Sequence, residues 1–251
     1  MRPDAVHAVI AVKNLDRAKS RLADRLPAPQ RSRLVLAMLS DTVTAGLAAG
    51  LGSVTVVTPD QRVAAAVRAL GATVHPDPTE AGPIDRSPAA GGTGPEYADG
   101  LNSALASAAA AVRERHGAVD LLALQADLPA VHADELAAAL TAAPGAGRAV
   151  VVDHTGRGTA ALIVRAGAGD AGALMPRFGP DSARRHRESG AVDLEGQWPG
   201  LRLDVDTADD LDRAVSLGVG AATAALLTDI GWPGGVHEKL IRRCVTPSHV
   251  C

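Results

Sequence analysis

Short apolar runs alternate with segments of helical character along most of the chain. Runs that fit buried strands cover residues 6–12, 54–57, 72–75, 121–124, 148–152 and 160–164. Helices are expected between and after them, over residues 29–47, 61–70, 100–115, 134–140, 207–218 and 221–228. Strands that alternate with helices in this way predict an α/β fold, with a mainly parallel mixed sheet flanked by helices.

One stretch interrupts the alternation. Residues 77–97 are rich in proline and glycine and poor in apolar residues, which predicts a flexible loop or a lid over a site. Asn102 follows near the expected start of the next helix, where its side chain would cap the helix or contact a nucleotide. No composition shift marks a domain boundary, so residues 1–231 are interpreted as one domain and residues 232–251 as a C-terminal tail.

Composition narrows the classes of function. The 251 residues are 47% apolar, enough for a sizeable core, and carry a net charge of −3. Aromatic residues make up only 2%, so stacking platforms for nucleic acid are nearly absent and no nucleic-acid partner is expected. No apolar run reaches the roughly 18 residues of a membrane span, and the N-terminus does not resemble a signal peptide. A cytoplasmic protein with no membrane partner is the expectation.

Three aspartates are the candidate metal ligands. Asp127 follows an apolar strand, at the position where open α/β sheets bind ligands, although an aspartate before proline also suits an ordinary turn. Asp204 and Asp206 are two positions apart and would point to the same side of a strand. Three converging carboxylates repel one another unless a hard cation lies between them, which predicts a Mg²⁺ site.

Basic residues follow the first strand. Lys13, Arg17, Lys19 and Arg21 could neutralise a triphosphate, although a solvated basic turn would have the same composition. Neither the P-loop pattern nor the dinucleotide-binding glycine pattern is present. Ser182 could cap a helix whose first N–H groups bind phosphate, or could be an ordinary cap.

These segments together resemble a known family over roughly residues 5–230. The chain is similar to the guanylyltransferases of deazaflavin coenzyme F-420 biosynthesis, the CofC/FbiD type. The matching segments are A-V-K-N-L-D-R-A-K-S-R-L (Ala11–Leu22), G-L-N-S-A-L (Gly100–Leu105), A-D-L-P (Ala126–Pro129), R-G-T-A-A-L (Arg157–Leu162), F-G-P-D-S-A-R-R-H (Phe178–His186) and D-V-D-T-A-D-D-L (Asp204–Leu211). The basic first loop and the F-G-x-x-S-A-R-x-H segment are the most specific of these.

The resemblance implies a single nucleotidyltransferase domain of the glycosyltransferase-A type. It implies transfer of GMP from GTP to phosphoenolpyruvate, with 2-phospho-L-lactate as the alternative acceptor, and a product passed to a downstream transferase. Thr159, Gly179 and Ser182 would hold the acceptor, and Asp127, Asp204 and Asp206 would hold Mg²⁺. The triphosphate would be bound by Lys13, Lys19 and Arg21, with Asn102 as a further nucleotide contact. A monomer or homodimer is expected.

Two other interpretations of the sequence remain open. A nucleotidyltransferase acting on a molybdopterin or a sugar alcohol phosphate would usually carry a glycine-rich first loop, where this chain has basic residues. A non-catalytic nucleotide-binding domain would be expected to lose metal ligands, whereas three candidate acids are present here.

Overall fold

A seven-stranded mixed sheet forms the centre of the molecule in the computed structural model, which describes residues 6–13, 15, 19–80, 95–166 and 173–232. The strand order is β3-β2-β1-β4-β6-β5-β7. The strands are β1 (Val6–Ala11), β2 (Ser53–Val57), β3 (Thr73–His75), β4 (Asp120–Leu124), β5 (Arg148–Val152), β6 (Thr159–Val164) and β7 (Val192–Asp193). All neighbouring pairs are parallel except the two that involve β6, which runs antiparallel to both β4 and β5.

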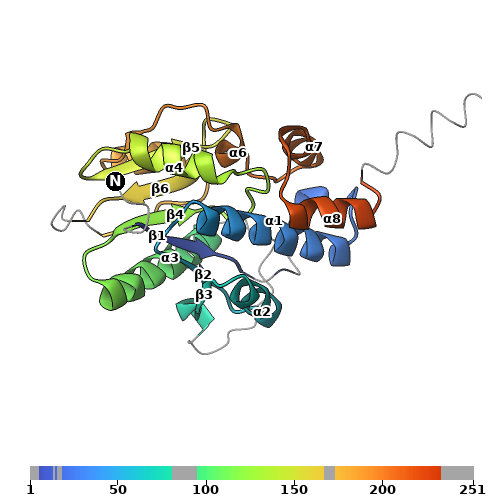
Figure 1. Cartoon of the computed structure of the whole chain (residues 1–251), viewed down its shortest axis with the longest axis horizontal. Coiled ribbons are helices and arrows are strands. Elements are labelled where there is room, and N and C mark those ends of the chain that lie inside the picture. Colours follow the sequence, from blue (N-terminus) through green and yellow to red (C-terminus); the bar gives the residue numbers. More distant parts are fainter. Residues whose placement is uncertain (1–5, 14, 16–18, 81–94, 167–172, 233–251) are drawn as a thin grey trace, which may run out of the picture.

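Helices cover both faces of this sheet (Figure 1). One face carries α1 (Ala28–Ala48), α2 (Gln61–Ala69), α4 (Ala133–Ala142), α6 (Pro199–Arg202), α7 (Ala208–Leu217) and α8 (Ala221–Asp229). The other carries α3 (Pro95–His116) and α5 (Ser182–Glu188). Two short 3-10 helices, η3 (Ser20–Leu22) and η4 (Pro78–Glu80), follow β1 and β3. The mixed sheet and flanking helices confirm the predicted fold class.

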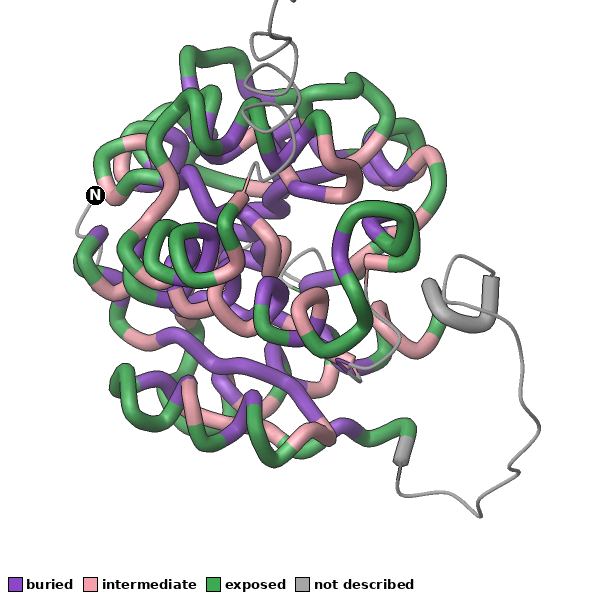
Figure 2. Tube along the Cα trace, turned by 90° about the vertical axis from the view of Figure 1, so that its right-hand side faces the viewer, coloured by how far each residue is buried: buried purple, intermediate pink, exposed green. Residues whose placement is uncertain are grey.

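The strands are apolar on both sides because both faces are covered. Val6, Ala8 and Ile10 of β1 pack into the core beneath α1, whereas Val9 packs into the smaller core beneath α3. This alternation follows from the period of two along a strand, and a near-continuous apolar run satisfies both cores at once. Figure 2 shows the resulting band of buried positions through the middle of the molecule, with exposed residues on the outer turns.

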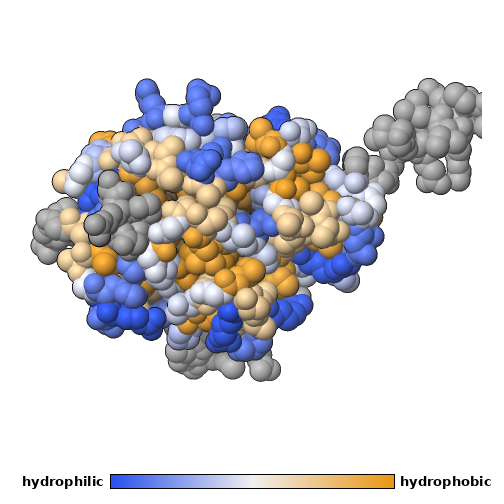
Figure 3. Space-filling model, viewed as in Figure 1, coloured by the Kyte–Doolittle hydropathy of each residue, from blue (hydrophilic) through white to orange (hydrophobic). Residues whose placement is uncertain are grey.

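Apolar and charged residues are only partly segregated on the surface. In the view of Figure 1, apolar residues gather in the middle of the face, around α1, and charged residues lie toward its rim (Figure 3). Among the described residues, no helix is both long enough and apolar enough to cross a membrane.

Strand direction brings three distant segments to one edge of the sheet. The carboxyl ends of β1 and β4 lie there because these strands are parallel. Since β6 is antiparallel to β4, with Leu124 opposite Ala161, the first residue of β6, Thr159, lies at the same edge. The segments after β1 and β4, which carry Lys19 and Asp127, therefore lie at the same edge as Thr159 at the start of β6.

Several predicted boundaries were wrong. The helix expected from Gly100 begins at Pro95, so Asn102 lies inside α3 and does not cap it. Residues 78–80 and 95–97 of the expected loop are helical, and residues 81–94 lie outside the described part of the chain, as do Arg17 and the tail after 232. The β7 strand and α6 were not foreseen from the sequence, because both are very short.

Candidate functional site

Lys19 joins two of the predicted metal ligands. Its Nζ atom donates to Asp206 Oδ1 at 2.9 Å and forms a very short ion pair with Asp127 Oδ2. Lys19 has a left-handed backbone conformation (φ 55°), which an L-residue adopts only at a cost. Arg21 NH1 lies 3.5 Å from Asp206 Oδ2 on the more exposed side. The basic loop and the two acidic segments therefore meet.

Burial and nearby charges shift the pKa values of Asp204 and Asp206 in opposite directions. Burial, then the negative charges of Asp127 and Asp206, raises the pKa of Asp204 to about 7. The ammonium group of Lys19 lowers the pKa of Asp206, and this attraction outweighs the effect of burial. Burial disfavours the charged form of Lys19, yet the two carboxylates raise the pKa of Lys19 above its ordinary value. The cluster is short of positive charge around Asp204.

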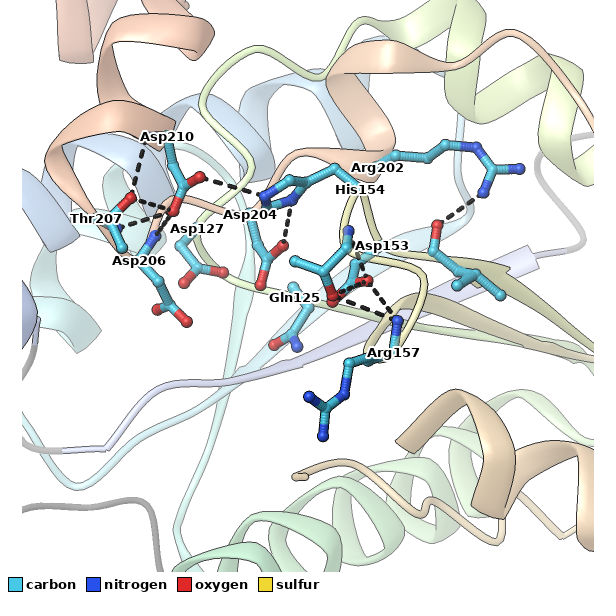
Figure 4. Close-up of polar contacts among 12 residues, drawn as sticks. Gln125, Asp127, Asp153, His154, Arg157, Arg202, Asp204, Asp206, Thr207 and Asp210 are labelled. Atoms are coloured by element: carbon cyan, nitrogen blue, oxygen red, sulfur yellow. Dashed lines mark hydrogen bonds and ion pairs between the residues drawn. The ribbon is translucent and has the colours of Figure 1, made fainter. Parts of the chain in front are cut away.

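The carboxylates suit a cation chemically. Asp204 Oδ1 is buried without a hydrogen-bond partner, although His154 Nδ1 lies 3.4 Å away without hydrogen-bond geometry. Asp127, Asp204 and Asp206 point toward one another from two segments (Figure 4). Within the described ranges, however, no three His, Cys, Asp or Glu side chains are arranged to hold a metal ion, and Lys19 lies between two of the acids. A metal would have to take over the position of the ammonium group.

The predicted strand at Asp204–Asp206 is absent, and both acids lie in an extended loop before α7. Val205 between them is fully buried. The Val205 N–H donates to the Asp127 carbonyl oxygen at 3.1 Å, which ties this loop to the segment after β4. The two acidic motifs are thus joined through the backbone as well as through Lys19.

His154 and Asp210 support the acidic loop and were not among the predicted site residues. His154 Nε2 lies 3.2 Å from Asp210 Oδ1 (Figure 4). The other oxygen of Asp210 accepts from the backbone N–H groups of Asp206 and Thr207, at 3.3 and 2.9 Å, and from the Thr207 hydroxyl at 2.7 Å. Thr207 and Asp210 form the capping box of α7, a spacing visible in the sequence, whereas nothing in the sequence places His154 there.

Lys13 lies farther along the same edge, against α3. Its Nζ atom is 3.4 Å from Thr79 Oγ1, and a Cβ atom added at Gly100 would overlap that Nζ atom. The lack of a side chain at Gly100 therefore leaves room for Lys13 beside the helix. Thr79 in turn donates to Asp77 Oδ1 at 2.7 Å, so the segment after β3 contributes to the position of Lys13.

Asn102 connects α3 to the segment before α5. Its Nδ2 atom donates to the Phe178 carbonyl oxygen at 3.1 Å, and its Oδ1 atom accepts from the Phe178 N–H at 2.8 Å. The nitrogen and the oxygen of the Asn102 side-chain amide therefore both bond to the backbone of Phe178. This pairing gives Asn102 a role in holding the Phe178 segment, and its contact with a nucleotide stays a prediction.

The predicted acceptor residues come together around His186. Thr159 Oγ1 lies 3.0 Å from His186 Nδ1, and Ser182 is one helical turn before His186 on α5. Gly179 has φ 113°, a conformation open mainly to glycine, and its carbonyl accepts from the Ser182 N–H at 3.1 Å. Thr159 and Ser182 are both buried.

The prediction that Ser182 caps α5 was wrong. Asp181 occupies the N-cap position with φ 52° and makes no side-chain cap, while Ser182 is the first helical residue. The Asp181 carboxylate is instead paired with Arg157, at 2.8 Å from NH2. Ser182 is therefore available for other contacts, because capping does not occupy its hydroxyl.

Curated relatives match nearly the whole chain. A phosphoenolpyruvate guanylyltransferase of Nocardia farcinica is 61% identical over 245 residues, covering 97% of this chain and 100% of its own length. A protein of the same name from Rhodococcus erythropolis is 52% identical over 224 residues, covering 89% of this chain and 96% of its own. No family model matches the chain.

Solved structures agree on the fold. A protein of Desulfovibrio desulfuricans, assigned as a nucleotide-diphospho-sugar transferase, superposes with a TM-score of 0.57 at 13% identity, covering 95% of this chain and 97% of its own. A nucleotidyl transferase from Methanothermobacter has a TM-score of 0.54 at 18% identity, with 83% and 94% coverage. With the sequence identity of its curated relatives, the chain belongs to the phosphoenolpyruvate guanylyltransferase family and has a nucleotidyltransferase fold.

Proposed function

We propose that this chain transfers GMP from GTP to phosphoenolpyruvate, forming enolpyruvoyl-2-diphospho-5'-guanosine and releasing diphosphate. The observation that carries the proposal is the meeting of Lys19 with Asp127 and Asp206 at the sheet edge where Thr159 begins β6, in a chain of this family. Acidic, cationic and hydroxyl side chains at one edge suit a reaction between two phosphorylated molecules.

The reaction depends mainly on how the two substrates are positioned, and less on proton transfer. A phosphate oxygen of the acceptor attacks the α-phosphorus of GTP, and the bond to the leaving diphosphate breaks. Because that oxygen is already anionic at neutral pH, no general base is required. The main barrier is the repulsion between two anions, which fixed cations reduce.

Each group of residues has a proposed part in this reaction. Lys13, Lys19 and Arg21 hold the triphosphate and the leaving diphosphate through charge-assisted hydrogen bonds. Asn102 would contact the nucleotide, and its hydrogen bonds to Phe178 hold the segment that carries Gly179 and Ser182. The acceptor is held by Thr159, the Gly179 backbone and Ser182.

Asp127, Asp204 and Asp206 would hold Mg²⁺ in the working enzyme. When bound, the ion would neutralise phosphate charge and orient the reacting groups. The buried, unpartnered Asp204 oxygen and the raised pKa of Asp204 support a cation at this point. Lys19 supplies the positive charge between Asp127 and Asp206 in the structure described here.

We further propose that the reaction belongs to deazaflavin coenzyme F-420 biosynthesis in the cytoplasm. The product is an activated diphosphate, and a downstream transferase that breaks this diphosphate bond would consume it. This placement follows from the resemblance of the chain to that group of guanylyltransferases.

Diphosphate release tests the proposal directly. The purified chain is incubated with Mg²⁺, each nucleoside triphosphate in turn, and either phosphoenolpyruvate or 2-phospho-L-lactate. We expect release with GTP and phosphoenolpyruvate. Faster turnover with 2-phospho-L-lactate would reassign the acceptor, and no release with either acceptor would overturn the function.

Two variants test the site assignments. Asp127→Asn keeps the shape of the side chain but weakens it as a ligand, so turnover should fall at least about 100-fold. Ser182→Ala should raise the KM for phosphoenolpyruvate by about tenfold, the value of one hydrogen bond to a charged group. Asp229→Asn is the matched control, because Asp229 is exposed on α8 and pairs only with Arg33 among the described residues. Near-normal turnover of Asp127→Asn would exclude the metal assignment.

A further inference from the structure

His186 uses both of its ring nitrogens at the base of the acceptor region. The residue is fully buried on α5, and its ring meets the Phe178 ring edge-on, with 5.2 Å between centroids. The Arg177 backbone nitrogen lies 2.9 Å from Nε2, and Thr159 Oγ1 lies 3.0 Å from Nδ1. One ring thus links the start of β6, the segment before α5 and α5 itself.

The backbone contact determines where the ring proton lies. The Arg177 N–H can only donate, so Nε2 must carry its lone pair. Burial, then the charge of Arg148, lowers the pKa of His186 to about 4, so the ring is neutral at neutral pH. A neutral ring that accepts at Nε2 carries its proton at Nδ1. The nearby Ser182 carbonyl also favours a proton on the ring.

This proton position then orients the Thr159 hydroxyl. A protonated Nδ1 donates to Thr159 Oγ1, so the threonine cannot direct its own hydrogen at the ring. Among the residues that the structure describes, Thr159 Oγ1 has no hydrogen-bond partner besides His186. A buried hydroxyl hydrogen without an acceptor is costly, and a ligand oxygen would satisfy it.

We propose that His186 is a positioning residue that directs the Thr159 hydroxyl hydrogen toward the acceptor, so that this position selects a substrate presenting an anionic oxygen. The inference rests on the proposed function and extends it to specificity. A neutral hydroxyl oxygen at this point would also accept the hydrogen, but a bond to an anionic oxygen is roughly twice as strong, so the position favours the anionic acceptor. A carboxylate or phosphate oxygen accepts the hydrogen without rearrangement of the ring.

Nuclear magnetic resonance of the ring nitrogens in the unliganded full-length protein tests the first step. We expect His186 to carry its proton at Nδ1 and to be neutral at neutral pH. A proton at Nε2, or a doubly protonated ring, would overturn the inference. This measurement needs no turnover, so it stays decisive even if phosphoenolpyruvate proves not to be the acceptor.

Two substitutions at His186 test the second step. The amide of asparagine reaches the position of Nδ1 and can donate to Thr159, whereas the amide of glutamine reaches the position of Nε2 and satisfies only Arg177. We therefore expect His186→Gln to raise the KM for phosphoenolpyruvate by about tenfold, with the KM for GTP unchanged within about twofold. His186→Asn should retain most of the acceptor affinity. Equal effects of the two variants on both substrates would overturn the proposal.

Substitutions at Thr159 keep the test informative if the His186 variants do not fold. Thr159→Ser preserves the hydroxyl and should keep the acceptor KM within about threefold, while the isosteric Thr159→Val should raise it by about tenfold. Wild-type acceptor affinity in Thr159→Val would show that the hydroxyl does not contact the acceptor. Failure of the wild-type protein to use phosphoenolpyruvate, with the expected ring proton present, would count against the proposed function alone.

Discussion

Replacement of Lys19 by methionine removes the positive charge that lies between Asp127 and Asp206. The Lys19 side chain is only 10% exposed and that of Asp127 18%, so water screens this pair poorly. Loss of one partner of a buried ion pair costs about 3–5 kcal/mol. Asp206 is 49% exposed and keeps Arg21 nearby, so we reduce the expected loss of unfolding free energy to about 2–4 kcal/mol.

Urea unfolding in the presence of a chelator measures this loss. Arg33→Met is the matched control, because the Arg33–Asp229 pair is short at 2.6 Å but more than half exposed on both sides. That variant should lose less than about 1 kcal/mol. If Lys19→Met is as stable as the control, the acids do not depend on the ammonium group and the electrostatic account of the site is wrong.

The same unfolding experiment, repeated with Mg²⁺, tests whether the ion takes the position of the Lys19 ammonium group. A divalent ion that takes the place of the ammonium group should stabilise Lys19→Met more than the wild-type protein, in which it must displace Lys19 first. We expect saturating Mg²⁺ to recover at least about 1 kcal/mol of the loss in the variant. Equal stabilisation of both proteins would show that the ion binds elsewhere.

Three further predictions concern stability. The pKa of His186 is lowered from 6.5 to about 4, so at this residue the unfolded chain binds more protons between these values, and His186 should contribute a loss of up to about 3 kcal/mol as the pH falls through this range, measured as the difference between the urea stabilities of the wild-type protein and His186→Asn, in which the opposite effect of Asp204 cancels. Asp210→Asn weakens the capping box with Thr207 and should lower the unfolding free energy by about 1 kcal/mol in the same assay, whereas unchanged stability would contradict the capping role. Gly200→Ala places a Cβ atom against the Ala130 backbone carbonyl and should cost about 1–3 kcal/mol, visible as a lower melting temperature.

Local patterns in the sequence predicted the elements of this fold. The apolar runs at Val6–Ala11 and Asp120–Leu124 are strands because an unbroken apolar segment can satisfy a core on each face. The position of Asp127 just after β4 followed from the same reasoning, since parallel strands end at one edge. Boundaries were less accurate, as at α3, because short-range propensity does not specify where tertiary packing begins or ends a helix.

The sequence by itself determined the strands, most of the helices and the residue types available for chemistry, because these depend on neighbours along the chain. Tertiary structure decided which of them meet. Lys19 is 108 positions from Asp127 and 187 from Asp206, and only the sheet order brings them together. The contact of His186 with Thr159 likewise depends on β6 running antiparallel, a property set by the packing of the whole sheet and not by any local pattern.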